Sequence, residues 1–270
     1  MTETKNASRL PFYLLLIGVF LISSFAVYIY QNRSSAASSD SSAASKDADD
    51  AVAAAGMSDA ERKATEALVR AYILENPEII TEAIGVLQSR EMAQRLESVG
   101  DAIKTPFAGD VAGNPNGDIT IVEFTDYNCG FCRQTVADVD QLLKSDGNIR
   151  LIYREIPILK PSSRTAALWA LAAAKQGKHD AFHRAMFAAG KPDDATIRKA
   201  AQNVGLDMAA AEKFASSAEA NAELDNNLAM MQQIGFNGTP TFIIGNQIIE
   251  GAQGFDRLNA AIKKARESKS

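Results

Sequence analysis

The feature that most constrains the fold is a pair of cysteines at the junction of a predicted strand and a predicted helix. Cys129 and Cys132 are the only cysteines among 270 residues, and they form the sequence Cys-Gly-Phe-Cys. A strand-like apolar run, 119–125, precedes them, and apolar residues follow at helical spacing over 136–143. A helix N-terminus offers unpaired N–H groups and partial positive charge, which favour a thiolate at the leading cysteine. The pattern therefore predicts a site of disulfide exchange.

The composition is that of an ordinary globular protein. Hydrophobic residues make up 46% of the chain and charged residues 23%, which is enough apolar material to bury a core. The net charge of −5 gives no indication of a nucleic-acid partner. The sequence contains neither a phosphate-binding loop nor a dinucleotide-binding glycine motif, so no cofactor is predicted.

The N-terminus carries a membrane signal. Pro11 to Tyr30 has no charged residue and would span about 30 Å as a helix. Lys5 and Arg9 precede this run, which places the N-terminus in the cytoplasm. We therefore predict a cytoplasmic tip and transmembrane anchor over 1–33, with a cleaved signal peptide as the alternative. Either interpretation delivers the rest of the chain to an oxidising compartment.

Two segments separate this run from the cysteines. Residues 34–56 are mostly Ser, Ala and Asp, and they predict a flexible linker because large apolar residues are lacking. Residues 57–104 predict a helical arm that starts at the capping box Ser58-Asp59-Ala60-Glu61. Its apolar stripe ends at Ile103 and needs a partner. Two interpretations stay open: self-association through 58–103, or folding back onto the following domain.

The remaining residues, 105–270, predict one α/β domain. A strand at 149–154 follows the cysteine helix, and a helical block covers about 162–235 and includes one long helix over 208–234. Two short strands at 241–244 and 247–250, with Gly-Asn between them, predict a hairpin before a closing helix.

This order of elements, together with four matching features, resembles the thioredoxin superfamily and more closely its DsbA-like branch. The features are the Cys-x-x-Cys motif, Glu123 six residues before it, Thr239-Pro240, and the strand that follows. The resemblance implies a thioredoxin-like fold with the block 162–235 inserted. Residues 72–78 also look like the N-terminal segment of ScsC-type, copper-tolerance-associated members, some of which oligomerise through it.

The resemblance also implies roles for the matching residues. Cys129 would be the exposed nucleophile and Cys132 the resolving thiol. Glu123 would be a buried proton shuttle, unless it faces solvent at the strand end. Pro240 would be cis, with the Thr239 backbone pairing with an extended client.

The dipeptide between the cysteines bears on the direction of the reaction. Gly130 and Phe131, combined with Thr-Pro, look more like the DsbC-like isomerases than like DsbA itself, which is similar in layout but has Pro-His. Both residues are assigned to the client-binding surface. We expect a milder oxidant than the strongest members of the family.

The predicted function is a thiol–disulfide oxidoreductase or isomerase for unfolded or misfolded exported proteins, served by a membrane redox partner. The predicted location is the bacterial periplasm, either tethered to the inner membrane or soluble after signal cleavage. A metal-handling, copper-tolerance binding protein and a reductant dedicated to one client are the alternatives. His179 and His183 have metal-compatible spacing, but packing is favoured because no third ligand accompanies them. Asp126 is predicted to be a solvated loop or cap residue.

Overall fold

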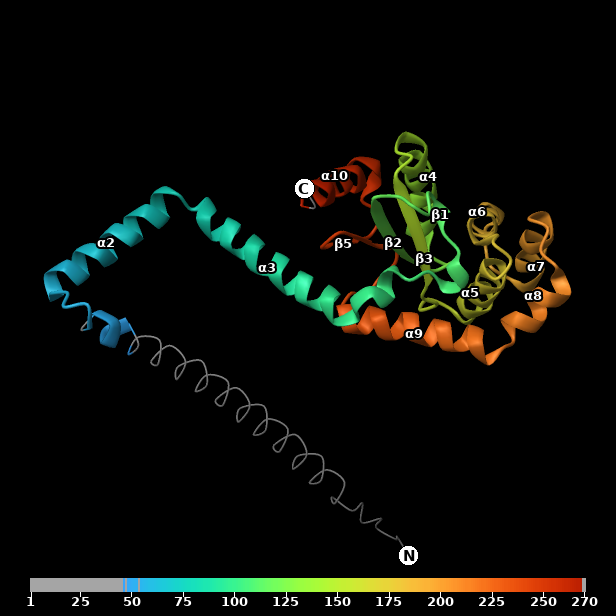
Figure 1. Cartoon of the computed structure of the whole chain (residues 1–270), viewed down its shortest axis with the longest axis horizontal. Coiled ribbons are helices and arrows are strands. Elements are labelled where there is room, and N and C mark those ends of the chain that lie inside the picture. Colours follow the sequence, from blue (N-terminus) through green and yellow to red (C-terminus); the bar gives the residue numbers. More distant parts are fainter. Residues whose placement is uncertain (1–45, 47, 53, 269–270) are drawn as a thin grey trace, which may run out of the picture. The chain divides into compact units, whose positions relative to one another are not determined.

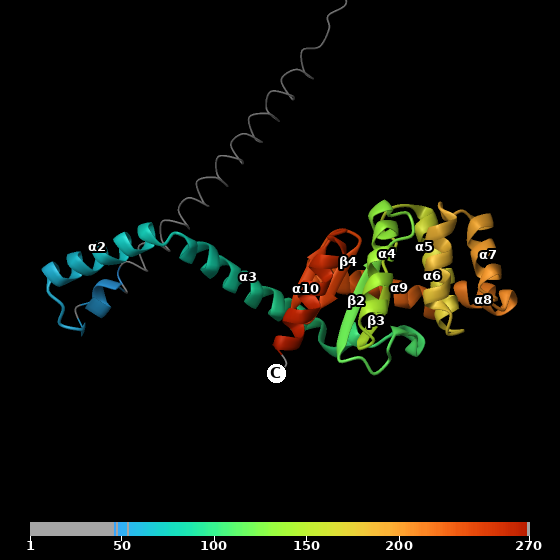
Figure 2. The same cartoon turned by 90° about the horizontal axis from the view of Figure 1, so that it is seen from above.

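The computed structural model describes residues 46, 48–52 and 54–268, which belong to two compact units that divide between Ile80 and Thr81. Most elements of the described residues are labelled in Figure 1, and β4 is labelled in Figure 2. They are α2 (Asp59–Glu75), α3 (Glu78–Val99), η1 (Gly100–Lys104), η2 (Phe107–Gly109), β1 (Ala112–Gly113), β2 (Ile119–Thr125), α4 (Gly130–Ser145), β3 (Ile149–Glu155), α5 (Pro161–Ala174), α6 (His179–Ala189), α7 (Asp194–Asn203), α8 (Met208–Ala215), α9 (Ala218–Ile234), β4 (Thr241–Ile244), β5 (Gln247–Glu250) and α10 (Gly254–Glu267).

The described part of the larger unit is built on a five-stranded sheet in the order β1-β3-β2-β4-β5. The central strands β2 and β3 are parallel, and the other neighbours pair antiparallel. The predicted strands 119–125, 241–244 and 247–250 are confirmed, and β3 runs one residue beyond the predicted 149–154. Strand β1 was not predicted. The parallel register matters for the site because β2 and β3 end at the same edge.

Helices cover both faces of this sheet, and alternate strand residues point to opposite faces. Ile121 and Leu151 pack under α4 and α10, whereas Val122 and Ile152 face the end of α9 and the end of the arm. Figures 1 and 2 show α5 to α8, which belong to the inserted block, grouped at one end of the sheet. This arrangement is the DsbA-like thioredoxin fold predicted from the sequence.

The inserted block covers α5 to α9, close to the predicted limits of 162–235. The prediction of a single helix over 208–234 was wrong, because α8 ends at Ala215 and α9 starts anew at Ala218. The Ser217 hydroxyl accepts a hydrogen bond from the Ala220 N–H at 3.1 Å, which is the N-cap of the second helix. Gly235, with φ of 86°, takes the left-handed conformation that ends α9.

The arm's apolar stripe divides into two parts. Leu96, Val99 and Ile103 pack against the sheet face beneath α9, so this part folds back onto the domain. Ile84 and Leu87 keep 49% and 56% of their surface exposed, so the first part stays uncovered in the described residues. The larger unit accordingly begins within the predicted arm of 57–104. In the smaller unit, α2 begins at the predicted capping box and buries none of its residues.

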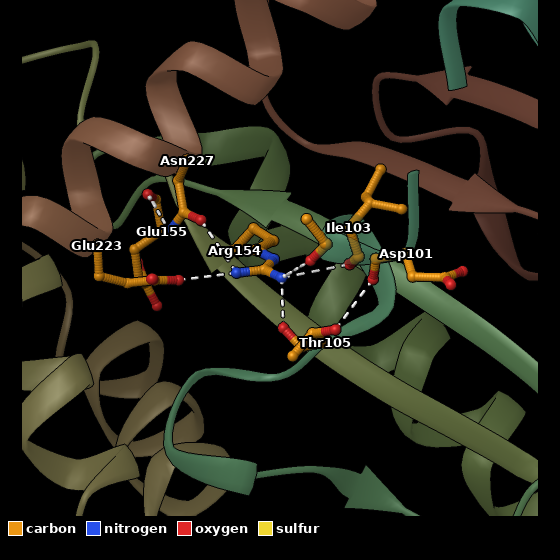
Figure 3. Close-up of polar contacts among 8 residues, drawn as sticks. Asp101, Ile103, Thr105, Arg154, Glu155, Glu223 and Asn227 are labelled. Atoms are coloured by element: carbon orange, nitrogen blue, oxygen red, sulfur yellow. Dashed lines mark hydrogen bonds and ion pairs between the residues drawn. The ribbon is translucent and has the colours of Figure 1, made fainter. Parts of the chain in front are cut away.

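A buried arginine fastens the end of the arm to the sheet (Figure 3). Arg154 on β3 donates to the carbonyls of Ala102 and Thr105 at 2.6 and 2.5 Å. It also donates to Glu223 at 2.7 Å and Asn227 at 3.2 Å, both on α9. One guanidinium therefore joins the arm, the sheet and the inserted block, using the planar array of donors that only arginine offers.

Two predictions for the N-terminal region fall largely outside the described residues. Pro11–Tyr30, the predicted anchor, lies entirely outside them. In the linker 34–56, residues 46, 48–52 and 54 are helical, and the rest is outside the description apart from a turn at 55–56. Within the part of the chain that the structure describes, no helix is long and apolar enough to cross a membrane.

Candidate active site

The two cysteines lie at the start of α4, as the sequence predicts. Cys129 is the N-cap residue, and its Sγ accepts a hydrogen bond from the Cys132 N–H at 3.2 Å. In the thiol form the same sulfur donates to the Thr239 carbonyl at 3.2 Å. Both cysteines are free thiols. Cys129 is more enclosed than predicted, with 5% of its surface exposed, because the segment around Thr239 lies against it.

The environment assigns opposite protonation states to the two thiols. A hydrogen bond from the Cys132 thiol, with smaller contributions from the Thr239 side chain and backbone N–H groups, lowers the pKa of Cys129 to about 6 against the effect of burial. Burial, and then the hydrogen bond with Cys129, raises the pKa of Cys132 far above its ordinary value. At neutral pH the leading sulfur is therefore a thiolate and the second sulfur a thiol, which is the pattern of a nucleophile and a resolving thiol.

Of the residues predicted to contact a client, Thr239 contacts the Cys129 sulfur, and Gly130 and Phe131 follow Cys129 in the chain. The Thr239–Pro240 peptide bond is cis, as predicted, and β4 follows it directly. Phe131 keeps 62% of its surface exposed. No atom lies within 4 Å of the position that a Cβ on Gly130 would take. The approach to the sulfur therefore combines an open backbone segment with an exposed aromatic ring.

Glu123 lies in the middle of β2, between Tyr153 of β3 and Phe242 of β4. Its exposed fraction is 1%, so the interpretation as a solvent-facing glutamate was wrong and the buried one is confirmed. Its Oε1 atom has no hydrogen-bond partner among the described residues. Burial, followed by the charges of Glu155 and Asp180, raises the pKa of Glu123 to about 8. Such a carboxyl group can take up or release a proton near neutral pH.

Asp126 lies in the loop before the cysteines, as predicted, but it is buried, so the prediction that it is solvated was wrong. Its Oδ1 accepts from the Asn128 N–H at 2.7 Å. Its Oδ2 accepts from the N–H groups of Ile158 and Leu159 at 2.9 and 3.0 Å. The carboxylate thus ties the cysteine loop to the loop after β3, and it holds Leu159, which is 49% exposed. Sequence reasoning missed this connection because the two loops are thirty residues apart.

The two histidines are buried in α6 and have protein partners. His179 Nε2 lies 2.9 Å from Glu155 Oε1, and the His183 ring stacks on Tyr153 with centroids 4.2 Å apart. His183 also meets the edge of Phe187, so the packing interpretation is confirmed for it. Among the described residues, no group of three His, Cys, Asp or Glu side chains has an arrangement that could hold a metal ion.

Known proteins match both parts of the chain. The DSBA-like thioredoxin domain model matches residues 120–263, and the Copper resistance protein ScsC N-terminal domain model matches residues 61–94. A solved thioredoxin-like oxidoreductase from Silicibacter pomeroyi is 40% identical, with a TM-score of 0.60 over 62% of this chain and 98% of that one. A linker-deletion mutant of ScsC from Proteus mirabilis is 26% identical, with a TM-score of 0.61 over 78% of this chain and 98% of that one.

The curated relatives include a much longer protein, of which only part matches this chain. Na(+)/H(+) antiporter NhaA 1 of Salinispora arenicola is 26% identical over 163 residues, which is 59% of this chain and 25% of the antiporter. The chain therefore spans about a quarter of the length of the curated relatives that it first matches.

Proposed function

The chain belongs to the DsbA-like thioredoxin family, and from that premise we propose that it exchanges disulfides with exported proteins through Cys129 and Cys132. The observation that carries the proposal is the position of the Cys129 sulfur, 3.2 Å from both the Cys132 N–H and the Thr239 carbonyl. The first contact stabilises a thiolate. The second brings the sulfur beside a backbone segment that can pair with a client. Ion transport is not carried over from the antiporter, because the chain covers a quarter of that protein.

The exchange proceeds by two displacements at sulfur. When the site is oxidised, a client thiolate attacks Cys129 Sγ, a mixed disulfide forms, and the Cys129–Cys132 bond breaks with its electron pair on Cys132. Glu123, buried on the adjoining strand and protonated at neutral pH, protonates that leaving thiolate. A second client thiol then displaces Cys129, which leaves as the stabilised thiolate. Reduction of a client disulfide follows the same steps in reverse.

Clients would bind mainly through their backbone. The Thr239 segment enters β4 and offers an extended chain a strand to pair with. Phe131 and Leu159, exposed by 62% and 49%, add apolar contacts at the mouth of the site. Backbone pairing with little side-chain recognition suits unfolded or misfolded proteins of varied sequence.

For the direction of reaction we propose disulfide reshuffling combined with mild oxidation. Gly130 and Phe131 stand where DsbA itself has Pro-His, and this dipeptide is more similar to that of the DsbC-like isomerases. The test is refolding of scrambled ribonuclease by the full chain and by Cys129→Ser, beside oxidation of reduced ribonuclease. Oxidation without reshuffling would refute the isomerase direction, and inactivity of the full chain in both assays would refute the proposed function.

The uncovered part of the arm supports a proposal of self-association. The exposed residues Ile84 and Leu87 belong to one helical stripe of α3. In the smaller unit, Val52, Val69 and Ile73 line an apolar groove. Light scattering should give a mass above one chain for the wild type and a lower mass for Leu87→Glu, while Gln88→Glu, its polar neighbour, serves as the control. A monomeric wild type would refute self-association.

The remaining assignments are proposals with direct tests. Periplasmic location with an inner-membrane anchor at Pro11–Tyr30 predicts that the full-length chain is recovered with membranes, whereas signal cleavage predicts a shortened soluble chain. A membrane redox partner would be trapped as a mixed disulfide by Cys132→Ser. The metal-handling alternative predicts stoichiometric metal in the purified protein. The alternative of a dedicated reductant predicts a single trapped client.

A further inference from the structure

A second buried glutamate, Glu155, shares a face of the sheet with Glu123 and takes no part in the exchange steps. Glu155 is fully buried at the end of β3, and Thr125 of β2 is its register partner. Two residues earlier in the same ladder, Glu123 pairs with Tyr153. Because alternate residues of a strand point to one face, these four side chains share a single face of the sheet. The two glutamates are therefore diagonal neighbours, and Thr125 and Tyr153 form the other diagonal of the same four residues.

This face holds unsatisfied oxygen atoms. Glu123 Oε1, Glu155 Oε2 and the Thr125 hydroxyl have no hydrogen-bond partner among the described residues. Buried polar atoms are nearly always paired, so three neighbouring exceptions need a physical reason. Two buried carboxyl groups at this spacing cannot both ionise at low cost. The pair accordingly retains a proton that either glutamate can carry.

The other oxygen of Glu155 leads toward the surface. Glu155 Oε1 accepts a hydrogen bond from the Tyr127 hydroxyl at 3.0 Å and lies 2.9 Å from His179 Nε2. On the far side of the ring, His179 Nδ1 lies 3.9 Å from Asp110 Oδ2. The Asp110 side chain keeps 12% of its surface exposed, so it meets solvent. An imidazole with a carboxyl group on each side can accept a proton on one nitrogen and release one from the other.

His183 provides a contrast on the same helix. Its Nδ1 lies 3.4 Å from the Tyr127 hydroxyl, and its ring is 2% exposed. In the described residues it has no hydrogen bond to Glu155 and no neighbouring carboxylate on its other nitrogen. Burial, and then the charge of His179, lowers the pKa of His183 well below its ordinary value. This histidine is a neutral packing residue.

We propose that Glu155 and His179 form a proton path between Glu123 and solvent, an inference that rests on the proposed thiol–disulfide function. Once Glu123 has given the shared proton to the Cys132 thiolate, both carboxyl groups of the pair are ionised. His179 Nε2 then protonates Glu155, the pair shares this proton so that it reaches Glu123, and His179 Nδ1 takes a proton from solvent beside Asp110. No electrons move in these steps, and the sum is one proton carried from water to Cys132. Reduction of a client runs the path outward.

Several other charged or titratable groups face this path from the elements packed around it. They are Asp126 and Tyr127 of the cysteine loop, Asp140 of α4, Tyr153 of β3, Asp180 and Arg184 of α6, and the Cys129 thiolate. Arg184 pairs with Asp180 and Asp140 at the surface. Because these groups are unchanged in the variants below, they contribute equally to each pH profile.

The test is stopped-flow reduction of the oxidised full chain by dithiothreitol, followed through the fluorescence of Trp169, which packs in the cluster that contains both cysteines. His179→Gln keeps a hydrogen-bond donor near Glu155 but cannot relay a proton. It should slow the reaction about tenfold, flatten its pH profile and respond to added imidazole. His183→Gln, the matched control, should keep the rate and the pH profile of the wild type.

A second variant guards against a purely structural effect. Glu155→Gln keeps the shape of the side chain and removes its titration, so it should reproduce the loss while imidazole gives no rescue. A wild-type pH profile in both His179→Gln and Glu155→Gln would overturn the path and leave the proposed function standing. Equal losses in the two histidine variants would also overturn it. A wild-type chain that fails to react with the dithiol would overturn both proposals.

Discussion

The pKa of Cys129 is the property on which the proposed chemistry depends most. The hydrogen bond from Cys132, with Thr239 and the helix N–H groups, lowers this pKa to about 6. At pH 7 about 90% of the sulfur is then thiolate. We would test this value by titrating the reduced chain with pH, using Cys129→Ser as the control that lacks the titrating group.

The stabilisation of the reduced fold that we expect follows from the ordinary pKa of a cysteine thiol, 9.0, and the lowered pKa of Cys129, about 6. A lowered folded pKa stabilises the reduced fold fully above the ordinary value, and this stability is lost as the pH falls through about 6. Above pH 9 the lowered pKa would stabilise the reduced fold by about 4 kcal/mol, but at pH 7 it contributes only about 1.4 kcal/mol. Solvent screening reduces this to about 1 kcal/mol at pH 7, or roughly 20 mV toward a more oxidising pair.

The assay is the thiolate absorbance near 240 nm, recorded between about pH 4 and pH 10 and corrected with Cys129→Ser. Its midpoint should lie near pH 6. Urea unfolding should show the reduced chain gaining stability over the oxidised chain between about pH 6 and pH 9. A midpoint above about pH 8 would refute the reasoning, because the Cys132 thiol and the helix terminus would then stabilise no thiolate.

Three further substitutions test neighbouring features. Glu123→Gln should slow exchange and raise stability at pH 8, since a carboxyl whose folded pKa is raised to about 8 costs the fold stability from about pH 4.5 upward. Urea melts at pH 5 and pH 8 would measure this gain, which is about 4 kcal/mol at the higher pH and about 1 kcal/mol at the lower. Arg154→Met should lower the free energy of unfolding by about 3 kcal/mol, because it leaves Glu223 and the carbonyls at the base of the arm unpaired. An unchanged thermal midpoint would contradict that role. Asp126→Asn should lower the free energy of unfolding by about 2 kcal/mol and reduce the exchange rate, because the single oxygen of an amide cannot accept all three backbone N–H groups. Equal exchange rates for the variant and the wild type would argue against this link between the loops.

The strands and the redox motif could be predicted because their signals are local. The run 119–125 and the pair 241–244 and 247–250 are short apolar segments bounded by turn residues, and their observed limits equal the predicted ones. Strand β1 could not be predicted in this way. Its two residues, Ala112 and Gly113, have no apolar period, and they are a strand only because β3 lies beside them.

The sequence likewise did not predict which part of the arm's apolar stripe is covered and which part is exposed. Ile84 and Val99 belong to the same apolar stripe, yet the first is 49% exposed and the second packs on the sheet. What separates them is the attachment of the arm's end by Arg154, whose partners lie in two distant segments, the end of the arm and α9. The spacing of apolar residues indicates that a helix has an apolar face, but it does not indicate which turns of the helix are covered by a packing partner.

The parallel register of β2 and β3 explains why the site contains more than the motif predicts. Because the two strands end at the same edge, the residues after Thr125 and after Glu155 emerge side by side. Asp126 therefore meets the N–H groups of Ile158 and Leu159 and is buried, although its sequence neighbours indicate a solvated loop. The same register sets Glu155 opposite Thr125 and diagonal to Glu123, where an isolated carboxyl becomes one of a coupled pair. The sequence identifies which groups can titrate, whereas the pairing of the two strands determines which of them can share a proton.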